Sequence, residues 1–182
     1  HAVLSRTISS LLKDDAGISI RHFAPLNSDL SEFVLQSTNS FRLNNLIVSD
    51  SIRGRIERIL KEYRQRELLY KNGLHNRSKI LLTGPSGTGK TMTASILANE
   101  LQLPLYIVRL EKVITKYMGE SSLKLGKVFE LISQVRGVYL FDEFDAIGSQ
   151  RRNENEVGEM RSILNTFLQM LERENSESLI IA

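Results

Sequence analysis

Residues 84–91 read Gly-Pro-Ser-Gly-Thr-Gly-Lys-Thr and combine three glycines with a lysine and a hydroxyl group at fixed spacing. Glycines let the backbone curl so that several N–H groups point inward, where they would surround phosphate oxygens. The Lys90 ammonium would reach the β- and γ-phosphates of a nucleotide, and the Thr91 hydroxyl would bind Mg²⁺. Every specified position of the G-x-x-x-x-G-K-[ST] pattern is matched, which predicts a nucleotide-binding loop formed by Gly84, Pro85, Ser86, Gly87, Thr88, Gly89, Lys90 and Thr91.

The segments that flank this loop predict the setting that such a site needs. Residues 79–82 form a short apolar run that indicates a buried strand, and residues 92–101 have the composition of a helix. The N-terminus of that helix would add its partial positive charge next to the phosphates. A glycine-rich turn without any ligand is the alternative, and the complete match in this setting favours the binding site.

A pair of carboxylates follows a second predicted strand, residues 137–141. Ligands bind at the carboxyl ends of parallel strands, which is where Asp142 and Glu143 would lie. Asp142 is predicted to hold Mg²⁺ through the water shell of the ion, and Glu143 to polarise the water that attacks the γ-phosphate. Glu143 and Lys90 are the predicted catalytic residues. Acidic residues also cap helices, and that alternative stays open for Asp145, which would otherwise lie in the outer shell of the metal.

Between the two predicted sites, residues 116–121 read Lys-Tyr-Met-Gly-Glu-Ser, which suits an exposed loop better than a helix or a strand. The segment resembles the first pore loop of the AAA family (ATPases associated with diverse activities). In that family an aromatic side chain from each subunit of a ring grips a substrate polypeptide. The resemblance predicts contact with a protein substrate through Lys116, Tyr117, Met118 and Gly119. The alternative is that Tyr117 and Met118 pack on the domain surface.

The resemblance to the AAA family extends over residues 43–182. Residues 84–91 resemble its Walker A motif, residues 141–145 its Walker B motif, and residues 159–171 the helix that follows Walker B. It implies an α/β fold of the P-loop NTPase kind, three layers (α/β/α) around a central parallel sheet, as in the AAA large subdomain without its helical lid. It also implies ATP and Mg²⁺ as cofactors, hydrolysis of ATP, a homo-hexamer, and an adenine pocket that involves Met92, Ile47 and Val48.

Two departures from the family pattern are visible. The glycine that the family has before its first domain helix has no clear match near residues 47–50. The sequence ends at the strand 179–182, so we expect the sensor-1 group, arginine fingers and lid to lie in a longer protein. We also expect that last strand to lack a neighbour and to form an exposed edge of the sheet.

The remaining elements are predicted from apolar spacing. Residues 51–70 should form one helix, capped by Asp50 or Ser51, with its apolar face formed by Ile52, Ile56, Leu60 and Tyr63. A strand is expected at 105–110 and a helix beginning at Ser121 or Ser122. Residues 150–156 are a polar connection or a second pore loop. Residues 1–42 carry no motif and are predicted to be an extension or linker before the ATPase domain, 43–182.

Composition narrows the class of protein. No apolar run approaches the length of a membrane span, and no signal segment is recognisable at the start. Cysteine is absent, which fits a reducing compartment such as the cytoplasm. The net charge of +3 is too small to indicate nucleic acid, and the basic residues of helix 51–70 alternate with glutamates.

The predicted function is therefore ATP binding and hydrolysis by a motor domain that remodels or threads a protein. An ATP-dependent switch or assembly scaffold is one alternative, which the paired carboxylates oppose. A nucleic-acid-associated ATPase is another, which the loop at 116–119 opposes.

Overall fold

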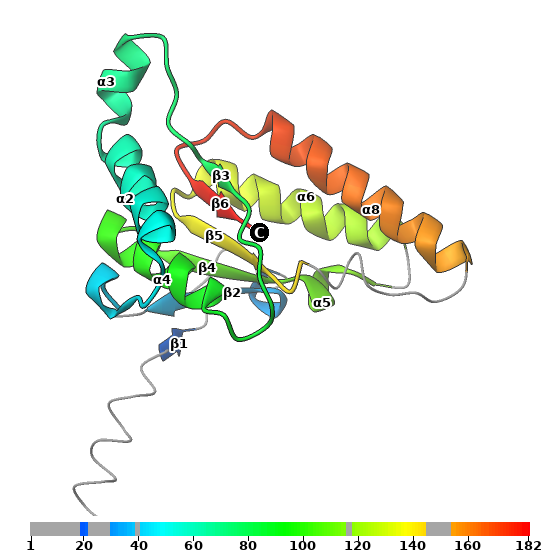
Figure 1. Ribbon diagram of the computed structural model, residues 1–182. Helices are drawn as coiled ribbons and strands as arrows, with labels where there is room; N and C mark the ends of the chain where they lie inside the picture. Colours follow the sequence, from blue (N-terminus) through cyan, green and yellow to red (C-terminus); the bar gives the residue numbers. More distant parts are fainter. Residues whose placement is uncertain (1–18, 22–29, 39–40, 116–117, 145–153) are drawn as a thin grey trace, which may run out of the picture.

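The computed structural model describes residues 19–21, 30–38, 41–115, 118–144 and 154–182, which form a six-stranded sheet with helices on both faces (Figure 1). The strands are β1 (Ser19–Arg21), β2 (Val34–Thr38), β3 (Lys79–Ile80), β4 (Leu105–Arg109), β5 (Val138–Asp142) and β6 (Leu179–Ile181). The helices are α2 (Asp50–Arg64), α3 (Arg66–Lys71), α4 (Lys90–Leu101), α5 (Leu110–Val113), α6 (Met118–Gln134) and α8 (Glu154–Arg173), with short 3₁₀ turns η1 (Leu30–Glu32) and η2 (Leu43–Asn45).

The sheet is mostly parallel, in the order β1-β2-β4-β5-β6-β3. Strands β4, β5, β6 and β3 run parallel, whereas β2 pairs antiparallel with β4, and β1 antiparallel with β2. The prediction of an α/β fold with a central parallel sheet is confirmed for these four strands. The two antiparallel strands at one edge were not expected.

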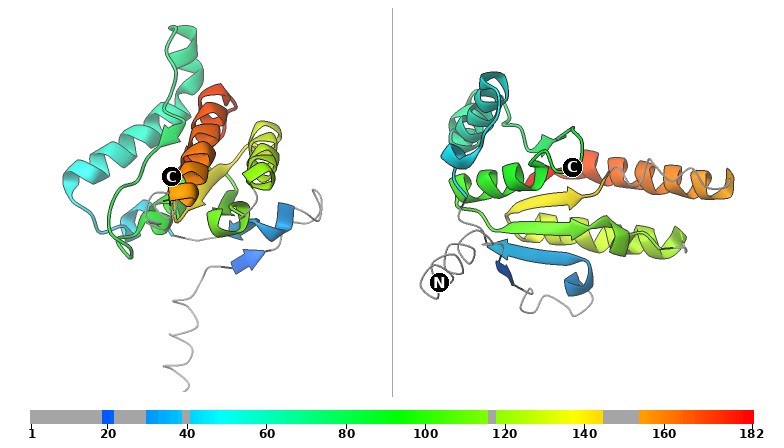
Figure 2. Two further views of the ribbon diagram at one scale, coloured as in Figure 1. Left: turned by 90° about the vertical axis from the view of Figure 1, so that its right-hand side faces the viewer. Right: turned by 60° about the horizontal axis from the view of Figure 1, so that its bottom comes forward.

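Alternation along the strands sends successive side chains to opposite faces of the sheet and so produces two cores. Helices lie on both faces of the sheet (Figure 2). On one face α2 and α4 cover Leu105, Val138, Leu140, Leu179 and Ile181. On the other face α5, α6 and α8 cover Tyr106, Val108, Tyr139, Phe141 and Ile180. The result is the predicted three-layer arrangement.

The helix expected at residues 51–70 is divided in two at Gln65. The N-cap of α2 is Ser49, whose hydroxyl accepts a hydrogen bond from the Ile52 N–H. The N-cap therefore lies before the predicted caps, Asp50 and Ser51. Ile56, Ile59, Leu60 and Tyr63 form the buried face of α2. Ile52 lies outside that face and is about half exposed, because it belongs to the first turn.

Part of the N-terminal segment joins the central sheet. Val34 pairs with Val108 and Ser37 with Leu105, and the Phe33 side chain is fully buried in the core on the α6 side. The division at residues 42 and 43 stays a prediction, but residues 30–38 are packed against the domain and do not form a linker. The alternation that places Val34 inward was too short to identify a strand.

The expectation for the last strand was wrong. β6 lies between β5 and β3 and pairs with both, while the short strand β3 lies at the edge. In the described part of the chain, no helix is both long enough and apolar enough to span a membrane.

Gly137 provides a test of this packing. A Cβ atom there would lie 2.6 Å from the Tyr106 ring and 3.1 Å from the Pro104 carbonyl oxygen. Tyr106 is buried and stacked on Tyr139 with ring centroids 4.8 Å apart, so it has little room to move. We expect Gly137→Ala to lower the free energy of unfolding by about 1–3 kcal/mol in a urea titration.

Gly54→Ala is the matched control for this substitution. Gly54 lies in α2, and nothing comes within 4 Å of the position that an added methyl group would occupy. Alanine there should therefore stabilise the protein by about 0.5–1 kcal/mol. Equal effects of the two substitutions would contradict the proposed packing of Gly137 against Tyr106.

Candidate nucleotide-binding site

A cavity of about 610 Å³ opens at the carboxyl ends of β3, β6 and β5. Residues of the 84–91 loop form one wall, and the residues that end β5 form the other. The lining includes Gly84, Ser86, Gly87, Gly89, Lys90, Thr91, Met92, Asp142 and Glu143. The sheet thus brings together two motifs that are about fifty residues apart in the sequence. They meet at the carboxyl ends of the parallel strands, where ligands bind in open α/β sheets.

The backbone of the loop has the conformation that its glycines permit. Gly87 and Gly89 have φ angles of 79° and 89°, a region that residues with side chains rarely adopt. Gly89 is also the N-cap of α4 and supplies no side chain to bond the first N–H groups of that helix. Those N–H groups and the helix dipole therefore suit an anion at this position.

Lys90 lies across the loop. Its Nζ atom donates hydrogen bonds to the carbonyl oxygens of Gly84 at 2.8 Å and Pro85 at 3.1 Å. Thr88 donates to the same Pro85 oxygen, which holds the loop closed on itself. A bound phosphate would offer the ammonium a charged acceptor in place of two neutral carbonyls, and hydrogen bonds between charged groups are the stronger kind.

Thr91 and Asp142 are the predicted metal ligands, and their side chains face each other. The Thr91 Oγ1 atom lies 3.5 Å from Asp142 Oδ2. An Mg²⁺ ion bound by the Thr91 hydroxyl would therefore lie beside Asp142, which could hold it through its water shell. Within the described ranges no group of three acidic, histidine or cysteine side chains could hold a metal. The remaining ligands of Mg²⁺ would be phosphate oxygens and water, as the ion prefers.

Glu143 occupies the next position with an unusual backbone. Its φ angle is 56°, in the left-handed region, and its N–H donates to Asp142 Oδ1 at 3.0 Å. The side chain is exposed to the cavity mouth, whereas Asp142 is partly buried. Residues in this backbone region are found most often at functional sites, where the surrounding structure fixes them.

Of the residues predicted for the adenine pocket, one lines the cavity and two lie outside its lining. Met92 lines the cavity. Ile47 and Val48 are absent from the lining: Ile47 is 98% exposed, and Val48 packs on the core beneath α2. The lining also contains apolar residues that the sequence analysis did not assign to the pocket: Leu81, Leu82, Leu140, Phe141, Phe144 and Ala182. Leu81, Leu82 and Ala182 lie together because β3 pairs with β6, a pairing that no local sequence pattern indicates.

The predicted substrate loop lies only partly in the described residues. Lys116 and Tyr117 are outside them, as is Asp145. Met118 and Gly119 begin α6, so the helix starts before the expected Ser121 or Ser122. Ser121 is buried, and its hydroxyl accepts from the Thr115 N–H at 2.9 Å. That hydrogen bond joins the end of the preceding segment to the first turns of α6.

Comparisons with known proteins agree with this geometry. Residues 80–182 match the family model described as ATPase family associated with various cellular activities (AAA). The chain is 31% identical over its whole length to "Uncharacterized AAA family ATPase y4kL" of Sinorhizobium fredii, of which it spans 57%. It is 38% identical over 49% of its length to "Putative 26S proteasome regulatory subunit homolog" of Methanothermobacter thermautotrophicus, and spans 24% of that protein.

A third relative is "Peroxisomal ATPase PEX6" of Debaryomyces hansenii, which is 34% identical over 62% of the chain. The chain spans 9% of that protein's length. The matched region contains the loop at 84–91, the paired carboxylates and the strand β5 that precedes them. The chain therefore belongs to the AAA family of ATPases.

Proposed function

We propose that the protein binds ATP with Mg²⁺ in the cavity between the 84–91 loop and β5, and hydrolyses it. We further propose that hydrolysis in a homo-hexameric ring remodels or threads a protein substrate. The observation that carries the proposal is the approach of Thr91 to Asp142 in a cavity that Lys90 and Glu143 also line. This arrangement supports a phosphate-binding role for the loop, a metal-binding role for Thr91 and Asp142, and a water-activating role for Glu143, all at the carboxyl ends of the parallel strands.

The chain's own groups would share the work of hydrolysis. Backbone N–H groups of the loop and the Lys90 ammonium would bind the β- and γ-phosphates, and Thr91 with Asp142 would hold the metal. Bound Mg²⁺ supplies positive charge that favours the leaving diphosphate. Glu143 would orient and polarise the attacking water, whose oxygen bonds to the γ-phosphorus as the bond to the ADP oxygen breaks.

Two features support a motor that acts on protein over the alternatives. An intact carboxylate next to the metal position favours hydrolysis over a switch or scaffold that only binds nucleotide. The sequence at 116–119 resembles a loop that contacts polypeptides, and two of the relatives are named as a proteasome regulatory subunit homologue and a peroxisomal ATPase. A nucleic-acid-associated ATPase has no comparable support.

The cytoplasm stays the predicted compartment, and that prediction depends only on the absence of cysteine.

Lys90→Ala is expected to weaken ATP binding about 10-fold to 150-fold, because it removes a charged hydrogen bond of about 1.5–3 kcal/mol to the phosphates. Titration calorimetry would measure the affinity, and circular dichroism would check the fold. Lys61→Ala, on the exposed side of α2, is the control that should bind normally. Unchanged affinity in the Lys90 variant would remove this residue from the site.

Glu143→Gln is expected to retain ATP binding and to lose about 10²–10⁴ in turnover, because an amide keeps the shape but polarises water poorly. Phosphate release and nucleotide affinity would be measured side by side. Glu57→Gln, another exposed glutamate, should turn over at the normal rate. Near-normal turnover of Glu143→Gln would show that another group activates the water.

Tyr117→Ala is expected to leave basal turnover unchanged and to abolish its stimulation by an unfolded protein such as casein. The reason is that an aromatic ring supplies grip by packing on a polypeptide. Tyr117→Phe keeps the ring and should keep the stimulation. If stimulation survives in the alanine variant, Tyr117 packs on the domain surface and the pore-loop interpretation is wrong.

A further inference from the structure

Three residues that carry hydroxyl groups line the nucleotide cavity: Thr83, Ser86 and Thr91. The Thr91 hydroxyl belongs to the proposed metal position beside Asp142. Thr88, also in the loop, is not part of the lining, and its hydroxyl donates to a carbonyl of the loop itself. Within the described ranges, the hydroxyl groups of Thr83 and Ser86 have no hydrogen-bond partner. Both groups are therefore available to a ligand.

Ser86 is the closer of these two residues, along the chain, to the Lys90 ammonium. The Nζ atom lies 3.1 Å from the Pro85 carbonyl oxygen, and the carbon of that carbonyl is bonded directly to the Ser86 nitrogen. Nζ also lies 2.8 Å from the Gly84 carbonyl oxygen, but the rest of Gly84 separates that carbonyl from Thr83. Ser86 therefore directly follows the part of the loop against which the ammonium lies.

The ammonium marks the part of the loop where the terminal phosphate would bind. In loops of this sequence pattern the backbone N–H groups surround the α- and β-phosphates, whereas the lysine reaches the β- and γ-phosphates. The N–H groups at the start of α4 follow Gly89, at the other end of the loop sequence. We therefore expect Ser86 to lie beside the γ-phosphate.

A serine hydroxyl at this place would distinguish ATP from ADP. The hydroxyl can donate one hydrogen bond, and phosphate oxygens are acceptors whose charge strengthens such a bond. ADP has no γ-phosphate and offers no acceptor there. The dipole and the first N–H groups of α4 act mainly on phosphates that both nucleotides share, so they add little to this preference.

The backbone at Ser86 allows the hydroxyl to be removed without other changes. In the described part of the chain, only two residues with side chains have a positive φ angle, Gln102 and Glu143, so Ser86 has a backbone that alanine also adopts. Ser86 is also exposed, so its side chain belongs to neither core. Loss of the hydroxyl should therefore leave the loop intact.

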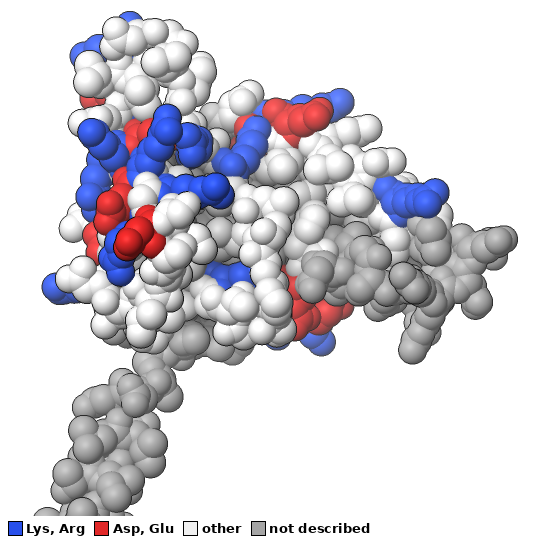
Figure 3. Space-filling model, viewed as in Figure 1, with Lys and Arg blue, Asp and Glu red and all other residues white. Residues whose placement is uncertain are grey.

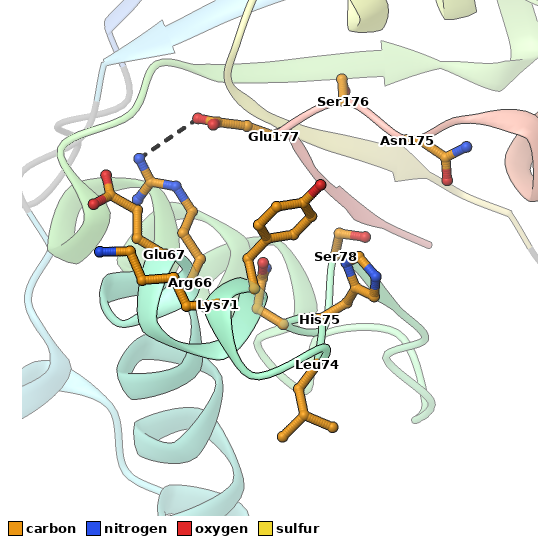
Figure 4. Close-up of a pocket in the computed structure, with 11 residues that line it drawn as sticks. Arg66, Glu67, Lys71, Leu74, His75, Ser78, Asn175, Ser176 and Glu177 are labelled. Atoms are coloured by element: carbon orange, nitrogen blue, oxygen red, sulfur yellow. Dashed lines mark ion pairs between the residues drawn. The ribbon is translucent and has the colours of Figure 1, made fainter.

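A cavity beside α3 offers phosphates no comparable place (Figure 4). It has a volume of about 670 Å³, lies before the amino ends of β3 and β6, and shares no lining residue with the nucleotide cavity. Its lining carries two positive side chains, Arg66 and Lys71, and two negative ones, Glu67 and Glu177. Figure 4 shows Arg66 paired with Glu177, and Figure 3 shows basic and acidic side chains intermixed over α2. Phosphates are therefore expected at the loop and not beside α3.

We propose that the Ser86 hydroxyl donates a hydrogen bond to the γ-phosphate of bound ATP, and that this bond makes the protein prefer ATP to ADP. The inference rests on the proposed function, because it takes the 84–91 loop as the phosphate site. It adds a residue that distinguishes the substrate from the product. After hydrolysis and release of phosphate the bond is lost, which favours replacement of ADP by ATP.

The test compares the affinities for two magnesium nucleotides by titration calorimetry: ADP, and the β,γ-imido analogue of ATP, which keeps three phosphates and resists hydrolysis. Ser86→Ala should bind the analogue about 5-fold to 12-fold more weakly and ADP as the wild type does, as expected for the loss of one hydrogen bond. Ser86→Thr keeps a hydroxyl and should keep the wild-type ratio of affinities. Thr83→Val removes the other available hydroxyl and should keep that ratio as well.

The affinity for ADP also reports whether each variant is folded. Equal weakening of both nucleotides in Ser86→Ala would overturn the inference, because the hydroxyl would then act on the shared phosphates or on the shape of the loop. An unchanged ratio in Ser86→Ala, or a ratio that falls in Thr83→Val instead, would overturn it too. A wild-type protein that binds neither nucleotide would contradict the proposed function, and this inference with it, so binding of ADP by the wild type separates the two failures.

Discussion

The parallel pairing of β5, β6 and β3 is the constraint on which the nucleotide site depends. Ile80, Ile181 and Leu140 form one row across these strands. Two residues beyond that row lie Leu82 and Asp142, so the chain that leads into the 84–91 loop and the carboxylate proposed to hold the metal leave the sheet at the same level. Neighbouring strands are about 4.8 Å apart, and β6 lies between the two motifs. The loop must therefore bend back across β6, which its glycines permit, before Thr91 comes within 3.5 Å of Asp142.

Burial explains why this arrangement is rigid. The side chains of Leu179, Ile180 and Ile181 are all buried, and they alternate between the two cores. β6 is thus held from both faces and from both edges. β3 has only two residues in the ladder, yet Leu82 donates from its N–H to the Ala182 carbonyl at 2.7 Å, so the backbone stays attached up to the loop. A short strand with a buried neighbour is enough to fix where the loop begins.

The parts of the fold that could be predicted are those that depend on nearby residues. The loop at 84–91, the carboxylates after β5 and the apolar faces of α2 and α8 each carry their own local pattern. The order of the strands does not, because β3 and β6 are about one hundred residues apart. That is why the edge was assigned to the wrong strand and why Leu81 and Ala182 were not expected in the cavity. The antiparallel strand β2 was missed for the same reason, since its inward residues are identified only by their partners on β4.

The central claim, that ATP binds with Mg²⁺ between the 84–91 loop and the end of β5, is tested most directly by amide hydrogen exchange with and without MgATP. Protection is predicted at residues 84–93 and 140–144, where the backbone borders the cavity, and not at residues 66–78. Protection that is confined to residues 66–78, or that appears without any change in the loop, would contradict the account.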